Sequence, residues 1–236
     1  MNKQSNTYTI IYIIVLVTLV GAAMAFAALS LKPLQTANAD ADKMKQILMS
    51  VNITPENGKV IDEFNHYITE QYVINAEGNR IDGKAFDINV ANESKLPIDS
   101  RKLPVYVCTL AQNDVKYILP VYGAGLWGPI WGYISVDSDG STIYGAYFAH
   151  QGETPGLGAE IEKPAFSNQF KGLHLFKENT FMPVNVLKAG QQPQHGEDAV
   201  DAISGGTITS KGVASMIDNC LTGYKVFLEQ LTSSHE

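Results

Sequence analysis

The chain has 236 residues, and its formal net charge is −7 because 24 Asp and Glu residues outnumber 17 Lys and Arg residues. This acidic balance, without a basic cluster, excludes a typical nucleic-acid-binding protein, since neutralising phosphates requires grouped Lys and Arg. Two cysteines exclude a disulfide-rich scaffold and a four-cysteine zinc or iron–sulfur ligand set. Charged residues make up only 17% of the chain, which favours a membrane element.

The strongest membrane signal lies near the N-terminus. Residues 4–31 contain no charged side chain, and residues 8–31 are predominantly apolar. A helix over 8–31 reaches about 36 Å, enough to cross a hydrocarbon core of about 30 Å. A cleaved signal peptide is the alternative, because Ala37-Asn38-Ala39 resembles a cleavage site. The apolar run is longer than the roughly 7–15 apolar residues of a signal peptide, so we expect an uncleaved transmembrane helix.

The predicted organisation has four parts. An N-terminal tip (1–7) on the cytoplasmic side precedes the transmembrane helix, and a tether (32–39) joins it to one domain (40–236). Lys3 precedes the span, whereas the charges after it are mixed. Because positive charge is retained on the cytoplasmic side of a membrane, this weak bias predicts an extracytoplasmic domain.

Periodicity predicts that this domain is α+β, with an antiparallel sheet and flanking helices. Apolar residues at helical spacing predict helices over 40–51 and 60–74, the first capped by Asp40 or Asp42. The last predicted helix has an apolar stripe that steps by three and four residues, formed by Val213, Ile217, Cys220, Tyr224, Phe227 and Leu231.

The middle of the chain is rich in strand signals. Runs of β-branched and aromatic residues over 104–110 and 115–122 predict a hairpin with its turn at 113–114. A second hairpin is predicted over 131–148, where the Asp-Gly step at 139–140 is the strongest turn signal in the chain.

Three smaller features complete the prediction. We expect a further strand pair within 170–186, and Thr209 or Ser210 as the cap of the last helix. Cys108 lies in an apolar strand and Cys220 lies on the apolar stripe, so both are expected as core residues. A disulfide between them stays open, because sequence does not test its geometry.

Three glycine-rich segments are candidates for binding chemistry. Residues 123–132 offer two tryptophan faces, although a tight strand connection with core tryptophans is the simpler interpretation. Residues 150–161 contain carboxylate, hydroxyl and amide groups that suit a planar heterocycle, and an ordinary solvated loop is the alternative. Residues 201–210 place hydroxyls and glycines before a helix, which suits either a phosphate or a simple cap. Neither a Walker loop nor a Rossmann fingerprint is present.

These segments resemble a known family. Ser204-Gly-Gly-Thr207, preceded by Asp201, resembles the Ser/Thr-Gly-Ala-Thr flavinylation motif of FMN-binding domains, with Gly206 in place of the usual Ala. The segment Glu153-Thr-Pro-Gly-Leu-Gly158 is similar to the Glu-Thr-Pro-Gly-Leu-Gly loop of that family. The segment before it, Gly125-Leu-Trp-Gly128, also matches.

The family includes the C subunit of the sodium-translocating NADH:quinone reductase and its close relative, the G subunit of the ion-translocating ferredoxin:NAD reductase. The resemblance implies FMN joined by a phosphoester to Thr207, attached by a flavin transferase, with Thr209 as the nearest alternative acceptor. It implies no catalytic side chain and no metal ligand. The cofactor-binding residues that it implies are Thr207, Ser204, Gly205, Gly206, Thr209, Glu153, Thr154, Leu157, Gly158 and Trp127.

The resemblance also implies partners and a location. The chain would be an electron-transfer subunit in a bacterial inner membrane, relaying electrons between an iron–sulfur centre and another flavin of the complex. NADH oxidation, quinone reduction and sodium transport would belong to the other subunits. An anchored binding module without redox activity is the alternative from a different functional class.

Overall fold

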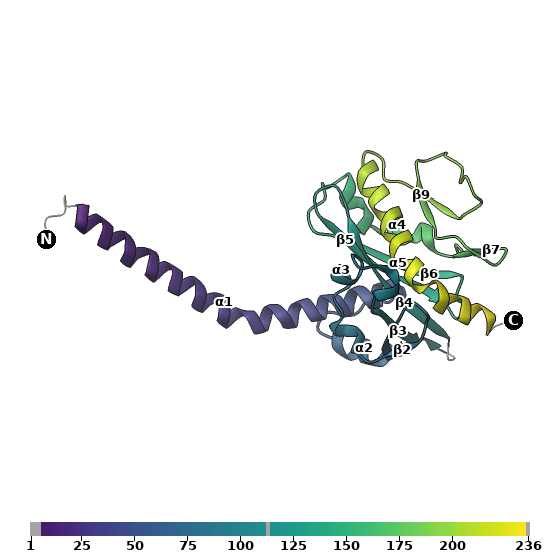
Figure 1. Cartoon of the computed structure of the whole chain (residues 1–236), viewed down its shortest axis with the longest axis horizontal. Coiled ribbons are helices and arrows are strands. Elements are labelled where there is room, and N and C mark those ends of the chain that lie inside the picture. The colour runs from purple at the N-terminus through teal and green to yellow at the C-terminus, as the bar shows by residue number, and fades with distance from the viewer. Residues whose placement is uncertain (1–5, 112–113, 235–236) are drawn as a thin grey trace. The chain divides into compact units, whose positions relative to one another are not determined.

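The structure is a computed structural model that describes residues 6–111 and 114–234 (Figure 1). The chain divides into two compact units, residues 1–43 and 44–236. Most of the predicted N-terminal tip and position 113 of the predicted hairpin turn lie outside the described residues.

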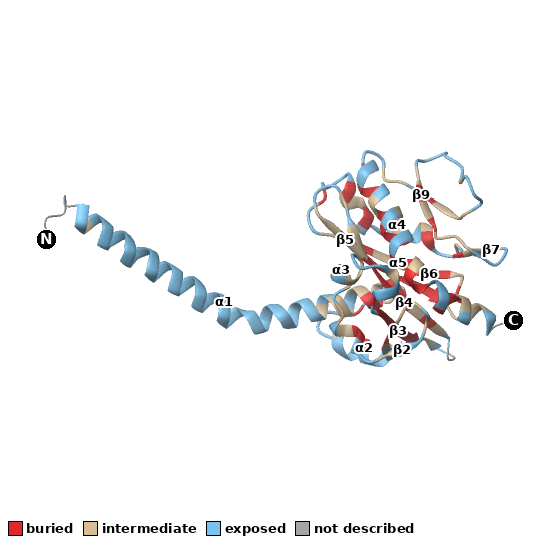
Figure 2. Cartoon of the chain, in the orientation of Figure 1, coloured by how far each residue is buried: buried red, intermediate tan, exposed pale blue. Residues whose placement is uncertain are grey.

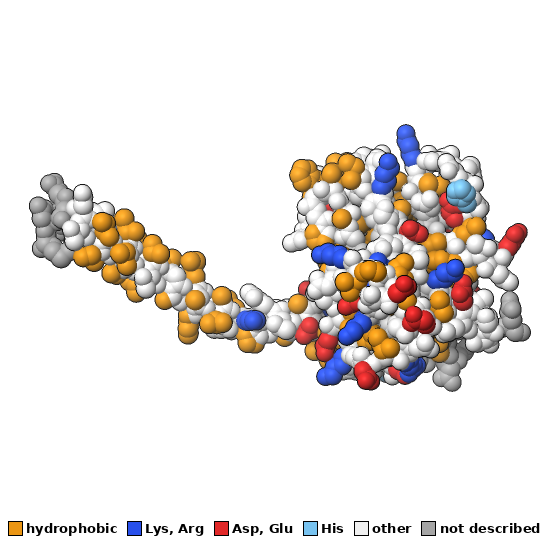
Figure 3. Space-filling model, in the orientation of Figure 1, with side chains coloured by type: hydrophobic (Ala, Val, Ile, Leu, Met, Phe, Trp, Pro, Cys, Tyr) orange, Lys and Arg blue, Asp and Glu red, His pale blue; other side chains and the backbone are white. Residues whose placement is uncertain are grey.

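The first unit is the larger part of one long helix, α1 (Asn6–Ser50). In the described part of the chain, this is the one helix long and apolar enough to cross a membrane. Hydrophobic side chains cover its N-terminal part (Figure 3). Thr18 and Ser30 donate their hydroxyls to carbonyls one turn earlier, so the span leaves neither group unpaired. The predicted helix over 8–31 is therefore present.

The structure differs from the prediction after this span. Residues 32–39, expected as a tether, continue α1, and Pro33 lies inside the helix. Asp40 and Asp42 also lie inside α1, so neither caps a helix start. A proline removes one helical hydrogen bond, but the residues that follow are mostly Ala, Leu, Gln, Lys and Met, which are good helix formers. Propagation of the helix therefore outweighs the break.

The second unit is built on a six-stranded antiparallel sheet with the order β2-β1-β3-β4-β5-β6. Its strands are β1 (Ile68–Ile74), β2 (Arg80–Ile81), β3 (Leu103–Thr109), β4 (Val115–Ala124), β5 (Pro129–Asp137) and β6 (Ile143–His150). Both predicted hairpins are confirmed, as β3–β4 and β5–β6. Gly140 has a φ of 70°, the left-handed conformation that its turn requires.

The helix predicted over residues 60–74 is wrong in its second half. Helix α2 (Val60–Tyr67) ends where β1 begins. Ile68, Val73 and Ile74 have the β-branched side chains that favour extended backbone. β1 also has strand partners on both sides, β2 and β3. These cross-strand contacts outweigh the helical spacing of the apolar residues.

The remaining elements are short, except for the last helix. They are η1 (Ala85–Asp87), α3 (Val90–Glu93), η2 (Ile98–Ser100), η4 (Gly158–Glu162), α4 (Pro164–Ser167), η5 (Asn168–Phe170), β7 (Phe176–Lys177), β8 (Thr180–Phe181), β9 (Asn185–Leu187), β10 (Ala199–Asp201) and α5 (Thr207–Ser233). The strand pair predicted within 170–186 is the antiparallel β7–β8 pair. β9 and β10 pair in parallel.

Two hydrophobic cores lie on the two faces of the sheet, as the alternation of buried side chains along each strand requires. Figure 2 shows that the buried residues gather in the second unit, whereas most of α1 is exposed. α5 covers one face, and the hydroxyl of its buried Tyr224 donates to the carbonyl of Pro104 at 2.9 Å. The end of α1 and the helix α2 cover the other face through Ile47, Leu48 and Phe64. The α+β class is therefore confirmed.

Both cysteines are free and buried, one in each core. Cys108 lies on the face covered by α1 and α2, and burial raises the pKa of its thiol to about 12. Cys220 lies on α5, where its Sγ contacts the backbone N–H and carbonyl of Tyr122. The expectation of two core cysteines is confirmed, and no disulfide joins them.

Candidate functional site

The three glycine-rich segments meet at one buried carboxylate, that of Glu153. Its side chain lies in the turn after β6, and the residue is only 4% exposed. The backbone N–H of Trp127, between β4 and β5, donates to Oε1 at 2.8 Å. The hydroxyl of Thr209, in the first turn of α5, donates to Oε2 at 2.5 Å. Glu153 therefore joins all three segments.

Glycines allow the backbone to approach this carboxylate closely. A Cβ atom at Gly125 would lie 2.5 Å from Glu153 Oε1, and one at Gly158 would lie 2.5 Å from Oε2. Real side chains do not tolerate such contacts, so a methyl group at either position would displace the carboxylate or the backbone. Two of the motif glycines are thus explained by the space that Glu153 requires.

The hydrogen bonds to Glu153 also fix its charge. Burial by itself would raise the pKa of this carboxyl. The Thr209 hydroxyl and the backbone N–H groups of Trp127, Gly128 and Leu126 outweigh that effect and lower the pKa below its usual value. The group is consequently a carboxylate at neutral pH, held by the protein itself.

Thr207 is the first residue of α5, and it is exposed. Gly205 has a φ of 73°, and the following Gly206 is the N-cap, which provides no side-chain cap. The first N–H groups of a helix have no partner within that helix, and the helix dipole makes this end positive. An anionic group bonded to the Thr207 hydroxyl would lie beside these donors.

The predicted caps of α5 have other partners. The Thr209 hydroxyl donates to Glu153, and Ser210 Oγ accepts the backbone N–H of Ile203 at 3.0 Å. Both residues are buried inside the first turn of the helix. The prediction that either one caps α5 is therefore wrong, because the N-cap is Gly206, three residues before Thr209 and four before Ser210.

A small hollow of about 210 Å³ lies beside Thr207. It brings together residues of the segment after β6 with the start of α5. Its lining residues are Leu126, Glu153, Thr154, Leu157, Gly158, Gly205, Gly206, Thr207, Ile208 and Thr209. Eight of the ten predicted cofactor-binding residues thus lie in one place, although they come from two distant segments.

The other two predicted residues lie just outside this hollow. Ser204 lines the neighbouring cavity. Trp127 is 69% exposed, and its backbone N–H, rather than its indole ring, is bonded within the site. Leu126 and Ile208 also have exposed side chains here, and sequence reasoning missed both. Their positions in the sequence, directly next to Trp127 and Thr207, could have indicated that they belong to the site.

The neighbouring cavity of about 520 Å³ shares Gly205 and Thr207 with the hollow. It runs between β9 and the start of α5, and its charged lining residues are Lys188 and Lys211. No acidic residue of the described chain lines it, although the whole chain is acidic. Sequence reasoning missed both lysines. The spacing of Lys211, four residues after Thr207 on one helix face, could have revealed it.

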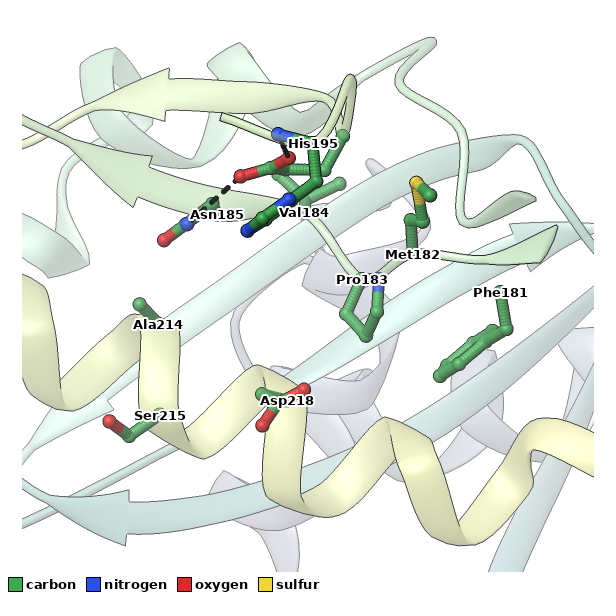
Figure 4. Close-up of a pocket in the computed structure, with 10 residues that line it drawn as sticks. Phe181, Met182, Pro183, Val184, Asn185, His195, Ala214, Ser215 and Asp218 are labelled. Atoms are coloured by element: carbon green, nitrogen blue, oxygen red, sulfur yellow. Dashed lines mark hydrogen bonds between the residues drawn. The ribbon is translucent and has the colours of Figure 1, made fainter. Parts of the chain in front are cut away.

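A third pocket, of about 410 Å³, continues along α5 (Figure 4). It lies between the segment 181–185 and α5, and it shares Asn185, Ala214 and Ser215 with the cavity just described. The side chain of Glu197 accepts hydrogen bonds from Asn185 Nδ2 and from the backbone N–H of His195. In the described residues, no group of three or more His, Cys, Asp or Glu is placed to hold a metal ion.

Comparisons with known proteins agree with this site. The family description of the FMN-binding domain matches residues 125–222, which include the second and third segments and residues 125–132 of the first. The C subunit of the Na(+)-translocating NADH-quinone reductase of Vibrio vulnificus (strain YJ016) is 36% identical, over 87% of this chain and 87% of that protein. The same subunit of Vibrio anguillarum is 34% identical, over 98% of this chain and 96% of that protein.

Two solved structures share the fold. The crystal structure of the same type of subunit from Parabacteroides distasonis ATCC 8503 has a TM-score of 0.79 and 48% identity, and the match covers 84% of this chain and 96% of that chain. The structure of Shewanella oneidensis NqrC has a TM-score of 0.69 and 25% identity, and the match covers 83% of this chain and 99% of that chain. The chain therefore belongs to the family formed by the C subunits of Na(+)-translocating NADH-quinone reductases.

Proposed function

We propose that this chain is an electron-transfer subunit of a membrane NADH:quinone reductase and carries FMN through a phosphoester to Thr207. The observation that carries the proposal is the position of Thr207. Its residue is exposed, stands first in α5, and borders both the hollow of Glu153 and the cavity of the two lysines. The names of the relatives support the assignment to such a reductase.

The residues present fit FMN. The phosphate would lie at the positive end of α5, where free backbone N–H groups and the nearby Lys211 favour an anion. The flat ring system would find exposed apolar side chains at Leu126, Leu157 and Ile208. The hydroxyl of Thr154, whose residue is exposed, is the polar group that remains available at the same rim.

Attachment of FMN needs no base from this chain. The Thr207 Oγ–phosphorus bond would form as a phosphoanhydride bond breaks in an activated FMN donor held by a flavin transferase. The hydroxyl proton would pass to the transferase or to the leaving phosphate. Thr209 is a poorer acceptor, because its residue is buried and its hydroxyl is already bonded to Glu153.

When bound, FMN supplies the redox chemistry, and the protein sets its orientation and surroundings. Glu153 holds the two loops and the start of α5 in register. The glycines keep the backbone close to that carboxylate. In this proposal the chain relays electrons between an iron–sulfur centre and another flavin, while the other subunits oxidise NADH, reduce quinone and transport sodium. We propose no separate catalytic side chain in this chain.

The location follows from the same proposal. The helix over residues 8–31 anchors the chain in a bacterial inner membrane, the N-terminus lies in the cytoplasm, and the domain lies outside. A covalent bond suits this location, because FMN lost outside the cytoplasm is not easily replaced. The G subunit of the ferredoxin-linked reductase stays the nearest alternative, and the proteins that co-purify with the chain distinguish the two complexes.

Expression with and without an active flavin transferase tests the proposal. We expect yellow, fluorescent protein on a denaturing gel only when the transferase is present. A colourless chain in the presence of an active transferase would favour the anchored module without redox activity. The transferase should be shown to modify a known flavoprotein in the same cells.

A further inference from the structure

The imidazole of His150 makes a contact whose direction depends on its protonation. His150 is the last residue of β6, and its side chain is 15% exposed. The backbone N–H of Glu153 donates to His150 Nδ1 at 3.1 Å. A ring nitrogen that accepts a hydrogen bond carries no proton, so this contact requires the neutral form of the ring with its proton on Nε2.

This contact completes the fixation of Glu153. The carboxylate end of the residue is held by Trp127 and Thr209, and the backbone end is held by His150. The turn between His150 and Glu153 consists of Gln151 and Gly152, both exposed. A Cβ atom at Gly152 would have no neighbour within 4 Å. The backbone N–H of Gln151 donates to the carbonyl of Pro129 at 3.1 Å, and the imidazole holds the other end of the turn through the backbone N–H of Glu153.

The charged groups around the ring are acidic. Glu162, at the end of η4, places Oε1 3.8 Å from Nε2, and the same oxygen accepts the backbone N–H of His150 at 3.3 Å. Glu160 of η4 accepts the backbone N–H of Gly156. On the neighbouring strand β5, the residue opposite His150 is the apolar Ile130. The negative charge of Glu162 would thus stabilise a second proton on the ring.

That proton has one place to bind. Nε2 already carries a hydrogen, so the imidazolium forms at Nδ1, which then becomes a donor facing the donor N–H of Glu153. Two donors at 3.1 Å cannot share a hydrogen bond, so this contact between the ring and the Glu153 backbone is lost.

We infer that His150 is a positioning residue for the flavin: its neutral ring holds the Glu153 turn in the flavin-binding arrangement, and its protonation releases that turn. The inference rests on the proposed function, because it assigns the turn to the flavin. In this proposal His150 acts through Glu153 and does not contact the flavin itself. A flavin at Thr207 would then change its surroundings with pH.

Two substitutions separate the role of Nδ1 from that of the ring as a whole. In His150→Asn, the amide oxygen falls near the position of Nδ1 and accepts a hydrogen bond at every pH. In His150→Gln, the longer side chain reaches towards the position of Nε2 and leaves the Glu153 N–H without its acceptor. Both variants are uncharged, so they differ chiefly in this one contact.

The first readout needs no flavin. Hydrogen–deuterium exchange of the full chain in detergent, followed by mass spectrometry, measures protection of the peptide over residues 150–158. After correction for intrinsic exchange, wild-type protection should fall by tenfold or more between pH 8 and pH 5. His150→Asn should be protected at both pH values, and His150→Gln at neither. Equal behaviour of the two variants, or protection independent of pH in the wild type, would overturn the inference.

The second readout uses the flavinylated chain. The absorption and fluorescence of the bound flavin should shift with a single-proton transition in the wild type, and should stay constant from pH 5 to pH 8 in His150→Asn. A flavin spectrum that ignores His150 while the exchange data follow it would overturn the role in positioning the flavin. Absence of any adduct on Thr207 is a separate result, which would contradict the proposed function.

Discussion

Glu153 and Thr209 lie 56 positions apart in the chain, and the hydroxyl of Thr209 donates a hydrogen bond to the carboxylate of Glu153 at 2.5 Å. The bond joins the turn after β6 to the first turn of α5. Both residues are buried. The two threonines at the start of α5 thus have different tasks in this account: Thr209 holds the site together, and the exposed Thr207 is the residue that we propose for modification.

The first prediction separates these two tasks. Thr207→Ala should abolish covalent flavin and leave the free energy of unfolding nearly unchanged, because the residue is exposed. Thr209→Val should retain the flavin but destabilise the chain by about 1–3 kcal/mol, since it leaves a buried carboxylate oxygen without its donor. Flavin fluorescence on a denaturing gel and chemical unfolding in detergent measure the two effects. Thr207→Ser and Thr209→Ser are the controls, and both should behave like the wild type.

The second prediction concerns the glycines around Glu153. Gly158→Ala should destabilise the chain by about 1–3 kcal/mol, the usual cost of overpacking, because its Cβ would collide with Glu153 and Thr209. Gly152→Ala is the matched control in the same segment after β6, where a Cβ meets open space. Equal unfolding free energies for the two variants would show that the carboxylate does not need the space at Gly158.

The third prediction compares the two glycines before Thr207. At Gly206 a Cβ would lie 3.1 Å from side-chain atoms of Ile203, a tight contact that a small shift relieves. Gly206→Ala should therefore fold and accept flavin, in agreement with the Ala that the family motif usually has there. Gly205→Ala combines a φ of 73° with a contact of 2.6 Å to Leu157. It should lose about 1–2 kcal/mol of stability and slow flavin attachment. The time course of flavin fluorescence with purified transferase measures the difference.

The fourth prediction follows from the lowered pKa of Glu153. A carboxyl whose pKa is lower in the folded than in the unfolded chain stabilises the fold above its unfolded value, about 4.3 for Glu. That contribution is lost as the pH falls through the folded pKa. Glu153→Gln has no such dependence, so its stability deficit against the wild type should be full above about pH 5 and should shrink at lower pH. Unfolding midpoints measured from about pH 3 to pH 7 test this. A deficit that stays constant over that range would contradict it.

Much of the fold could be predicted because the local signals agree with the tertiary structure. The Asp-Gly step at 139–140 forms the turn between β5 and β6, and the apolar stripe of α5 lies in the core. Residues 68–74 show where such reasoning fails. Their apolar spacing fits a helix, but pairing with two neighbouring strands decides the conformation, and sequence periodicity does not report strand neighbours.

The site was predicted less completely than the fold. The motifs identify its residues, but motif spacing does not show that Glu153 faces Thr209 or that His150 accepts the Glu153 amide. Those contacts join segments that the sheet and α5 bring together. Lys188 belongs to no motif, and only the structure shows that it lines the same cavity as Thr207, just after β9. The residue types of the site could therefore be predicted in part from the sequence, whereas the hydrogen bonds between them could be found only in the structure.

The most direct test of the central claim is mass spectrometry of the proteolytic peptide that contains Thr207, after co-expression with an active flavin transferase. The account predicts that this peptide gains the mass of one FMN less one water and that fragmentation places the added mass on Thr207. An unmodified peptide, or an adduct on Thr209, would contradict the assignment of Thr207 as the residue that carries the flavin.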